Sequence, residues 1–147
     1  MPSQAAAHDF PAWLLATCPD PKFRDAPRAV TLAQRAVELA PDDGHCWNTL
    51  GVAHYRAGDW KAAVDALTKS EELGPGPPLG HIGFFLTMAY WQLGKKDKAH
   101  QWYDKAVARM EKYRPQDVDL GRFRAEAEEL LGIQRPPPAP EKPATKP

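Results

Sequence analysis

The feature that most constrains the fold is a spacing that recurs along the chain. Like residues stand 34 positions apart in three cases: Trp13 and Trp47, Ala29 and Ala63, Pro41 and Pro75. Downstream the offset becomes 36, for Leu50 and Leu86, Gly58 and Gly94, and Ala63 and Ala99. The two extra residues fit in the loop GPGPPLG, residues 74–80. Self-similarity at a period of this size is typical of tandem helical repeats, in which each unit packs on the next.

Within one unit the apolar residues follow a helical period. Leu50, Ala53 and Ala57 share a helix face, and Ala63, Ala66 and Leu67 share the face of a following helix. Gly58-Asp59 between them is a predicted tight turn with a helix N-cap. Large residues therefore alternate with small ones, as expected for two antiparallel helices in close contact.

The repeats predict the domain boundaries. We expect a disordered N-terminus over 1–9 and a repeat domain over 10–133, with units near 10–41, 44–77 and 79–113 and a capping helix over 116–132. Pro19 and Pro21 should end the first helix of the first unit early. The last 14 residues, 134–147, contain six prolines and predict a disordered or extended tail.

Composition narrows the classes of function. Nineteen basic residues balance nineteen acidic ones, which gives no electrostatic argument for a nucleic-acid or membrane partner. Two cysteines imply no disulfide framework, and the N-terminus lacks the basic and apolar regions of a signal peptide. No apolar run approaches the ~20 residues of a membrane span. We therefore expect a cytoplasmic protein.

Residues that could carry catalysis or bind a cofactor do not converge. The loop GPGPPLG has three prolines in place of N–H donors and no lysine after it, so it does not predict a phosphate site. His100 and Asp104 form at most one edge of a metal site. Cys18 and the His45-Cys46 pair fall on different helices. We expect no catalytic residues, no metal and no cofactor, hence a protein that is not an enzyme.

The middle unit, WNTLGVAHYRAGDWKAAVDALTKSEELGP, resembles a tetratricopeptide repeat (TPR). It has the residues of that signature at Trp47, Leu50, Gly51, Gly58, Ala63, Leu67 and Pro75. The third unit lacks the tryptophan, with Gly83 in its place, and the first retains Trp13, Ala29, Ala36 and Pro41. The resemblance covers residues 10–113. It implies an all-α, right-handed α-α superhelix of about three helix pairs plus a C-terminal capping helix. The chain also resembles the TPR tails of large bacterial multidomain proteins.

In this family the first helix of each pair lines a concave groove that binds a peptide or partner protein. The resemblance places eight partner-binding residues there: His45, Asn48, Val52, Tyr55, His81, Phe84, Met88 and Trp91. The clamp that some members use for acidic chaperone peptides is absent, because Leu14, Cys18, Thr49, His81 and Phe85 stand at its positions.

The expected function is therefore a non-catalytic scaffold or adaptor module. Two points stay open at this level. The groove can be filled by a second copy in a self-associating structural module, and the aromatic stripe can be either an exposed groove or part of the core.

Overall fold

The computed structural model describes residues 3–74 and 80–134, and this part of the chain is helical throughout. It contains seven α-helices and one short 3₁₀ helix: α1 (Gln4–Thr17), η1 (Pro21–Phe23), α2 (Ala26–Leu39), α3 (Gly44–Arg56), α4 (Trp60–Leu73), α5 (Gly80–Gln92), α6 (Lys96–Tyr113) and α7 (Val118–Leu131). No strand occurs among these residues, and none of their helices is long and apolar enough to cross a membrane.

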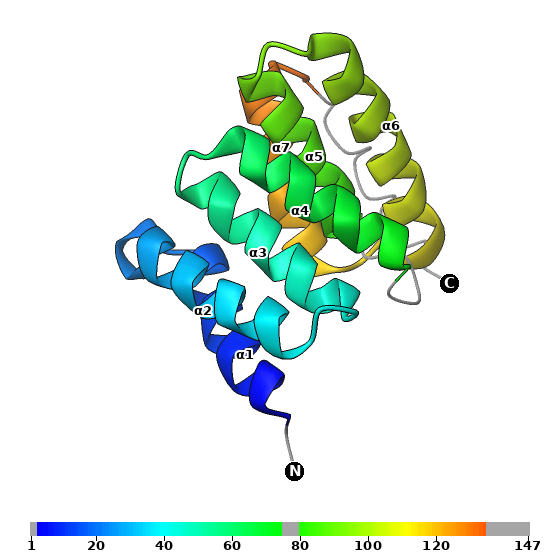
Figure 1. Ribbon diagram of the computed structural model, residues 1–147. Coiled ribbons are helices and arrows are strands. Elements are labelled where there is room, and N and C mark those ends of the chain that lie inside the picture. The colour runs from blue at the N-terminus through cyan, green and yellow to red at the C-terminus, as the bar shows by residue number, and fades with distance from the viewer. Residues whose placement is uncertain (1–2, 75–79, 135–147) are drawn as a thin grey trace, which may run out of the picture.

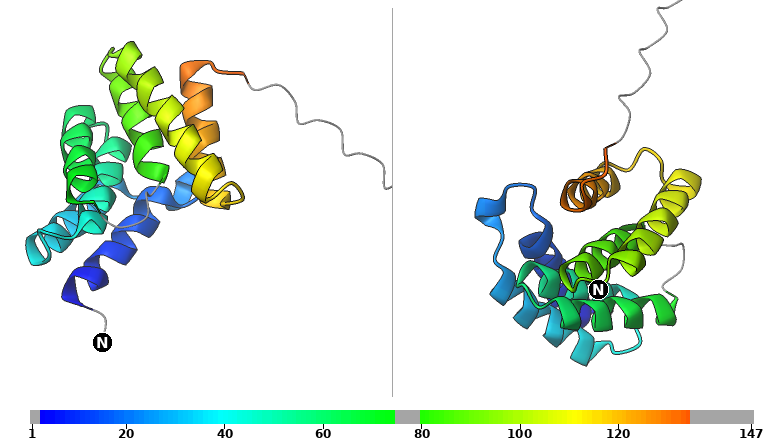
Figure 2. Two further views of the ribbon diagram at one scale, coloured as in Figure 1. Left: turned by 90° about the vertical axis from the view of Figure 1, so that its right-hand side faces the viewer. Right: turned by 90° about the horizontal axis from the view of Figure 1, so that it is seen from above.

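The helices stack as consecutive antiparallel pairs (Figure 1). Helix α1 packs on α2, α3 on α4 and α5 on α6, and neighbouring pairs meet where α2 contacts α3 and α4 contacts α5. The expected all-α helical repeat is therefore confirmed. Helix α7 follows α6 and packs mainly on α5 (Figure 2).

Aspartates begin most of the helices. Asp25, Asp43, Asp59 and Asp117 each accept a hydrogen bond from a backbone N–H in the first turn of α2, α3, α4 and α7, respectively. An N-cap carboxylate satisfies one of the N–H groups that a helix start leaves unpaired. Positive φ angles at Gly58 (83°) and Gly94 (78°) allow the sharp turns inside the second and third pairs.

The first helix differs from the sequence-based prediction. It begins at Gln4, within the segment expected to be disordered, because Ser3 caps it by accepting from the N–H of Ala6 at 3.1 Å. Ala5 is buried, which ties this extra turn to the core. The helix ends at Thr17, before the Pro19-Asp20-Pro21 segment, as predicted. The predicted tail over 134–147 and spacer over 74–80 lie almost wholly outside the described residues.

Two glycines allow the paired helices to cross closely. A Cβ at Gly51 would stand 2.5 Å from Cγ of Leu67, and a Cβ at Gly83 would stand 2.6 Å from Cβ of Ala106. Both distances are too short for real contacts. The sequence signature places a tryptophan at the position of Gly83, and the contact with Ala106 explains why no larger residue stands there.

Gly83→Ala should lower the free energy of unfolding by about 1–3 kcal/mol, because the added methyl group separates α5 from α6. Gly121→Ala is the matched control. Gly121 lies inside α7 with nothing within 4 Å of an added Cβ. Its replacement should raise stability by about 0.5 kcal/mol through helix propensity. Urea unfolding followed by circular dichroism measures both. A destabilisation equal in the two variants would contradict the proposed contact.

Candidate functional site

The first helices of the three pairs, α1, α3 and α5, form a common surface, called here the inner face. Helix α7 lies against it and contacts all three helices. Its Phe123 is fully buried, with ring-centroid distances of 4.9 Å to Phe85, 6.1 Å to Trp13 and 6.4 Å to His81. The middle of the inner face is therefore covered by the chain itself.

Polar contacts hold α7 in this position. The Arg56 guanidinium on α3 binds both carboxylate oxygens of Glu126 and donates from Nε to the carbonyl oxygen of Ala16 at 2.9 Å. Arg122 on α7 donates to the carbonyl oxygen of Thr17 at 2.8 Å. These bonds satisfy carbonyl groups at the C-terminal end of α1, where a helix leaves acceptors unpaired and favours positive charge.

Four of the five hydrophobic residues among the eight predicted partner-binding residues are buried, and the fifth is partly buried. Val52, Phe84 and Met88 are fully buried. Tyr55 is nearly buried between Trp60 and Phe85, with ring-centroid distances of 5.1 and 5.6 Å. Trp91 is partly buried and lies beside His100 and under the Lys96 amine, at the turn between α5 and α6. In this arrangement Phe84 and Met88 are core residues, and the binding role of these five residues stays a prediction.

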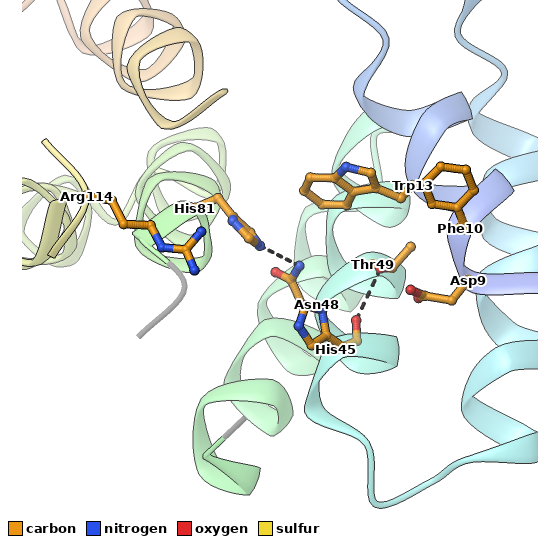
Figure 3. A pocket seen from close by; sticks show the side chains of 8 residues that line it. All are labelled: Asp9, Phe10, Trp13, His45, Asn48, Thr49, His81 and Arg114. Carbon is orange, nitrogen blue, oxygen red and sulfur yellow. Dashed lines mark hydrogen bonds between the residues drawn. The ribbon is translucent and has the colours of Figure 1, made fainter. Parts of the chain in front are cut away.

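The other three predicted residues, His45, Asn48 and His81, line one hollow of about 350 Å³, called here the inner pocket. Figure 3 shows its walls, which come from three first helices and the segment after α6. Besides those three residues the lining consists of Asp9, Phe10, Trp13, Thr49 and Arg114. The pocket thus joins residues that are up to 105 positions apart in the sequence, Asp9 and Arg114.

Asn48 and His81 form the polar floor of the inner pocket. Asn48 is 1% exposed, and its Nδ2 lies 2.8 Å from Nε2 of His81. Burial lowers the pKa of His81 to about 4, and the positive charges of His45 and Arg114 act in the same direction. The imidazole is therefore neutral at pH 7, so Nε2 accepts from the Asn48 amide and Nδ1 carries the proton.

Two acceptor atoms at the inner pocket have no hydrogen-bond partner among the described residues. They are Oδ1 of Asp9 and Oδ1 of Asn48, both buried. Burial raises the pKa of Asp9, and the Thr49 hydroxyl and the charge of His45 oppose this shift. Arg114 lies across the inner pocket from Asp9 in Figure 3 and is paired with Asp117, since its Nη1 lies 3.7 Å from Asp117 Oδ2.

Sequence reasoning missed the α1 side of the inner pocket. Asp9 fell in the segment predicted to be disordered, and Phe10 was placed only as a boundary. Two signals were available: Ser3 as an N-cap before an alanine run, and small residues at helical spacing, Ala5, Ala12 and Ala16. Among the described residues no cluster of three or more His, Cys, Asp or Glu side chains is arranged to hold a metal ion.

The fold defines a class: stacked antiparallel helix pairs of an α-α repeat protein. Residues 22–78 match the family model of the tetratricopeptide repeat. The family model describes a repeat and not a catalytic domain.

The chain is also similar to parts of known proteins. Human Superkiller complex protein 3 is 33% identical over 95 residues, which is 64% of this chain and only 6% of that protein. Solved structures of MamA AMB-1 and of a MamA mutant both superpose with a TM-score of 0.50 at 23% identity. They cover 88% of this chain, and this chain covers 76% and 81% of them, respectively. The structural likeness shows the fold alone.

The neutral His81 predicts a pH dependence of stability. Its pKa is about 4 in the folded protein against 6.5 as the ordinary value, so between these pH values the unfolded chain binds more protons. The free energy of unfolding should fall by up to about 3 kcal/mol as the pH drops from 6.5 to 4. Asp9, with its raised pKa, contributes with the opposite sign. The difference between the wild type and His81→Gln, measured by urea unfolding across this range, isolates His81. Parallel pH profiles would contradict the assignment.

The Arg56–Glu126 pair should be strongly coupled, because the Arg56 side chain is only 9% exposed. A double-mutant cycle with Arg56→Met and Glu126→Gln should give a coupling energy of about 1–3 kcal/mol. The exposed pair Arg35–Glu38, at 3.1 Å, is the control and should give less than about 0.5 kcal/mol. Equal coupling energies for the two pairs would show that Arg56 does not hold α7.

Proposed function

We propose that this chain is a non-catalytic protein–protein interaction module, a scaffold or adaptor, whose partner binds at the inner pocket. The observation that carries the proposal is the combination of an accessible aromatic ring with a polar hollow. Phe10 is 65% exposed at the rim, while the floor holds buried acceptor atoms without partners. Interfaces typically place an aromatic anchor beside a few polar groups that fix orientation.

The inner pocket suits a protein segment better than a small metabolite. The inner pocket lies on the inner face, where side chains of α7 already contact α1, α3 and α5, and this supports the binding of a further protein segment to the same face. Of the eight residues that the sequence assigns to partner binding, the proposal retains His45, Asn48 and His81 at the contact. A binding role for Val52, Tyr55, Phe84, Met88 and Trp91 stays a prediction.

The alternative is a self-associating module in which another copy fills the groove. It fits this arrangement less well, because α7 of the same chain already covers the middle of the inner face. A second hollow beside α1 and α7, lined in part by Leu14 and Phe23, is the surface that such a copy would use. Sedimentation velocity over a concentration series separates the two functions. Two further expectations stay predictions: a cytoplasmic location and an origin as the tail of a large bacterial protein.

Phe10→Ala should weaken binding of a partner isolated by affinity pull-down by about 2 kcal/mol, because it removes the exposed anchor at the rim. Phe23→Ala is the matched control: Phe23 is equally exposed, at 68%, and lies outside the inner pocket. Both variants should keep the wild-type helical signal and melting temperature. The measurement is titration calorimetry. Normal binding by Phe10→Ala would place the partner elsewhere on the molecule.

A further inference from the structure

We propose that the inner pocket selects a positively charged side chain of the partner, the ammonium of a lysine or the guanidinium of an arginine. This inference rests on the proposed function and adds the chemistry of the residue that is recognised. Three features of the inner pocket favour such a side chain: its unpaired acceptor atoms, its aromatic walls and its charges.

The inner pocket contains two buried oxygen atoms that lack a hydrogen-bond partner in the described part of the chain. A buried oxygen without a hydrogen bond is uncommon in folded proteins and is satisfied by a ligand or by water. None of the ion pairs among the described residues includes Asp9. The Thr49 hydroxyl acts on this carboxylate, but its Oδ1 is buried without a hydrogen-bond partner among these residues. The Oδ1 of Asn48 is in the same state, since the Asn48 amide reaches His81 through Nδ2. Both atoms accept and neither donates, so the complementary group is a donor.

The aromatic walls favour a cation over a neutral donor. Phe10 and Trp13 line the inner pocket one helix turn apart on α1, next to the Asp9 carboxylate (Figure 3). Lysine and arginine bind the faces of such rings while a carboxylate takes the N–H groups. The aliphatic part of either side chain also packs on aromatic carbon, so the whole side chain is accommodated.

The charges near Asp9 also favour a positively charged ligand. His81 is neutral, and Arg114 pairs with Asp117 and lies across the inner pocket from Asp9 in Figure 3. His45, which also lines the inner pocket, is the remaining basic group, and its effect on the pKa of Asp9 is opposed by that of Asp43. The negative charge of the N-cap carboxylate Asp43 acts to raise the pKa of Asp9. An acidic side chain at this end would meet the Asp9 carboxylate, so the inner pocket differs in charge preference from a clamp for acidic peptides.

The test titrates the full chain with Nα-acetyl-arginine amide, followed by two-dimensional ¹H–¹⁵N NMR. The neutral isostere Nα-acetyl-citrulline amide and the acidic Nα-acetyl-glutamate amide are the comparison probes. We expect saturable shifts at the Trp13 indole N–H and the backbone of residues 9–13 with the arginine probe. Binding should be at least ten times weaker with either comparison probe. Equal binding of the arginine and citrulline probes, or shifts that map outside the inner pocket, would overturn the proposal.

Two variants complete the test. Asp9→Asn retains the shape of the side chain and should weaken binding of the arginine probe at least tenfold, whereas Asp65→Asn, an exposed carboxylate on α4, should leave it unchanged. If Asp9→Asn alters the fold, the probe series on the wild-type chain decides alone. A natural partner that binds Asp9→Asn normally but fails to bind Phe10→Ala would refute the recognition of a cation and leave the proposed function intact.

Discussion

Close contact between the two helices of each pair is the interaction on which the rest of this structure depends. Small buried residues line these contacts, among them Ala12, Ala33, Ala63 and Ala106, all without measurable exposure. An alanine buries little apolar surface by itself, so the gain comes from the dispersion contacts that the adjacent backbones make. Larger side chains such as Leu67 and Phe84 then fill the spaces that the crossing leaves. Helix pairs built in this way present their first helices on one face, and that face is where α7 and the inner pocket are found.

Helix α7 has a different role from that of a simple end cap. A cap protects the exposed edge of the last repeat and needs only a polar outer side. This helix also reaches back to α1 and α3 through Arg56, Arg122 and Phe123. Burying the Arg56 side chain is favourable only because Glu126 and a helix carbonyl both accept from it. Phe123 also lies against Trp13, which lines both the inner pocket and the second hollow.

The repeat architecture could be read from the sequence because it depends on local rules. Glycine turns, aspartate caps and large-small alternation all act within about 30 residues, as at Gly58, Asp59 and Ala63. The course of α7 could not be read in this way. Phe123 and Arg122 look like ordinary members of an amphipathic helix, and nothing local indicates that their contacts lie on α1 and α5. The stripe containing Phe84 and Met88 shows the same limit, since helical spacing does not distinguish a groove from a core. Asp9 and Phe10 were not predicted as pocket residues because residues 1–9 were expected to be disordered, whereas the first helix begins at Gln4.

The bond between Arg122 and the Thr17 carbonyl joins residues 105 positions apart and closes an array that would otherwise be open. Open solenoids are quasi-one-dimensional: each unit senses only its neighbours, and terminal units fray independently. Contact between the last helix and the first removes that independence, because opening either end exposes surface at the other. The chain should therefore behave as one cooperative unit despite its modular origin. The same closure raises the average sequence separation of its contacts, which slows folding relative to an open array of equal length.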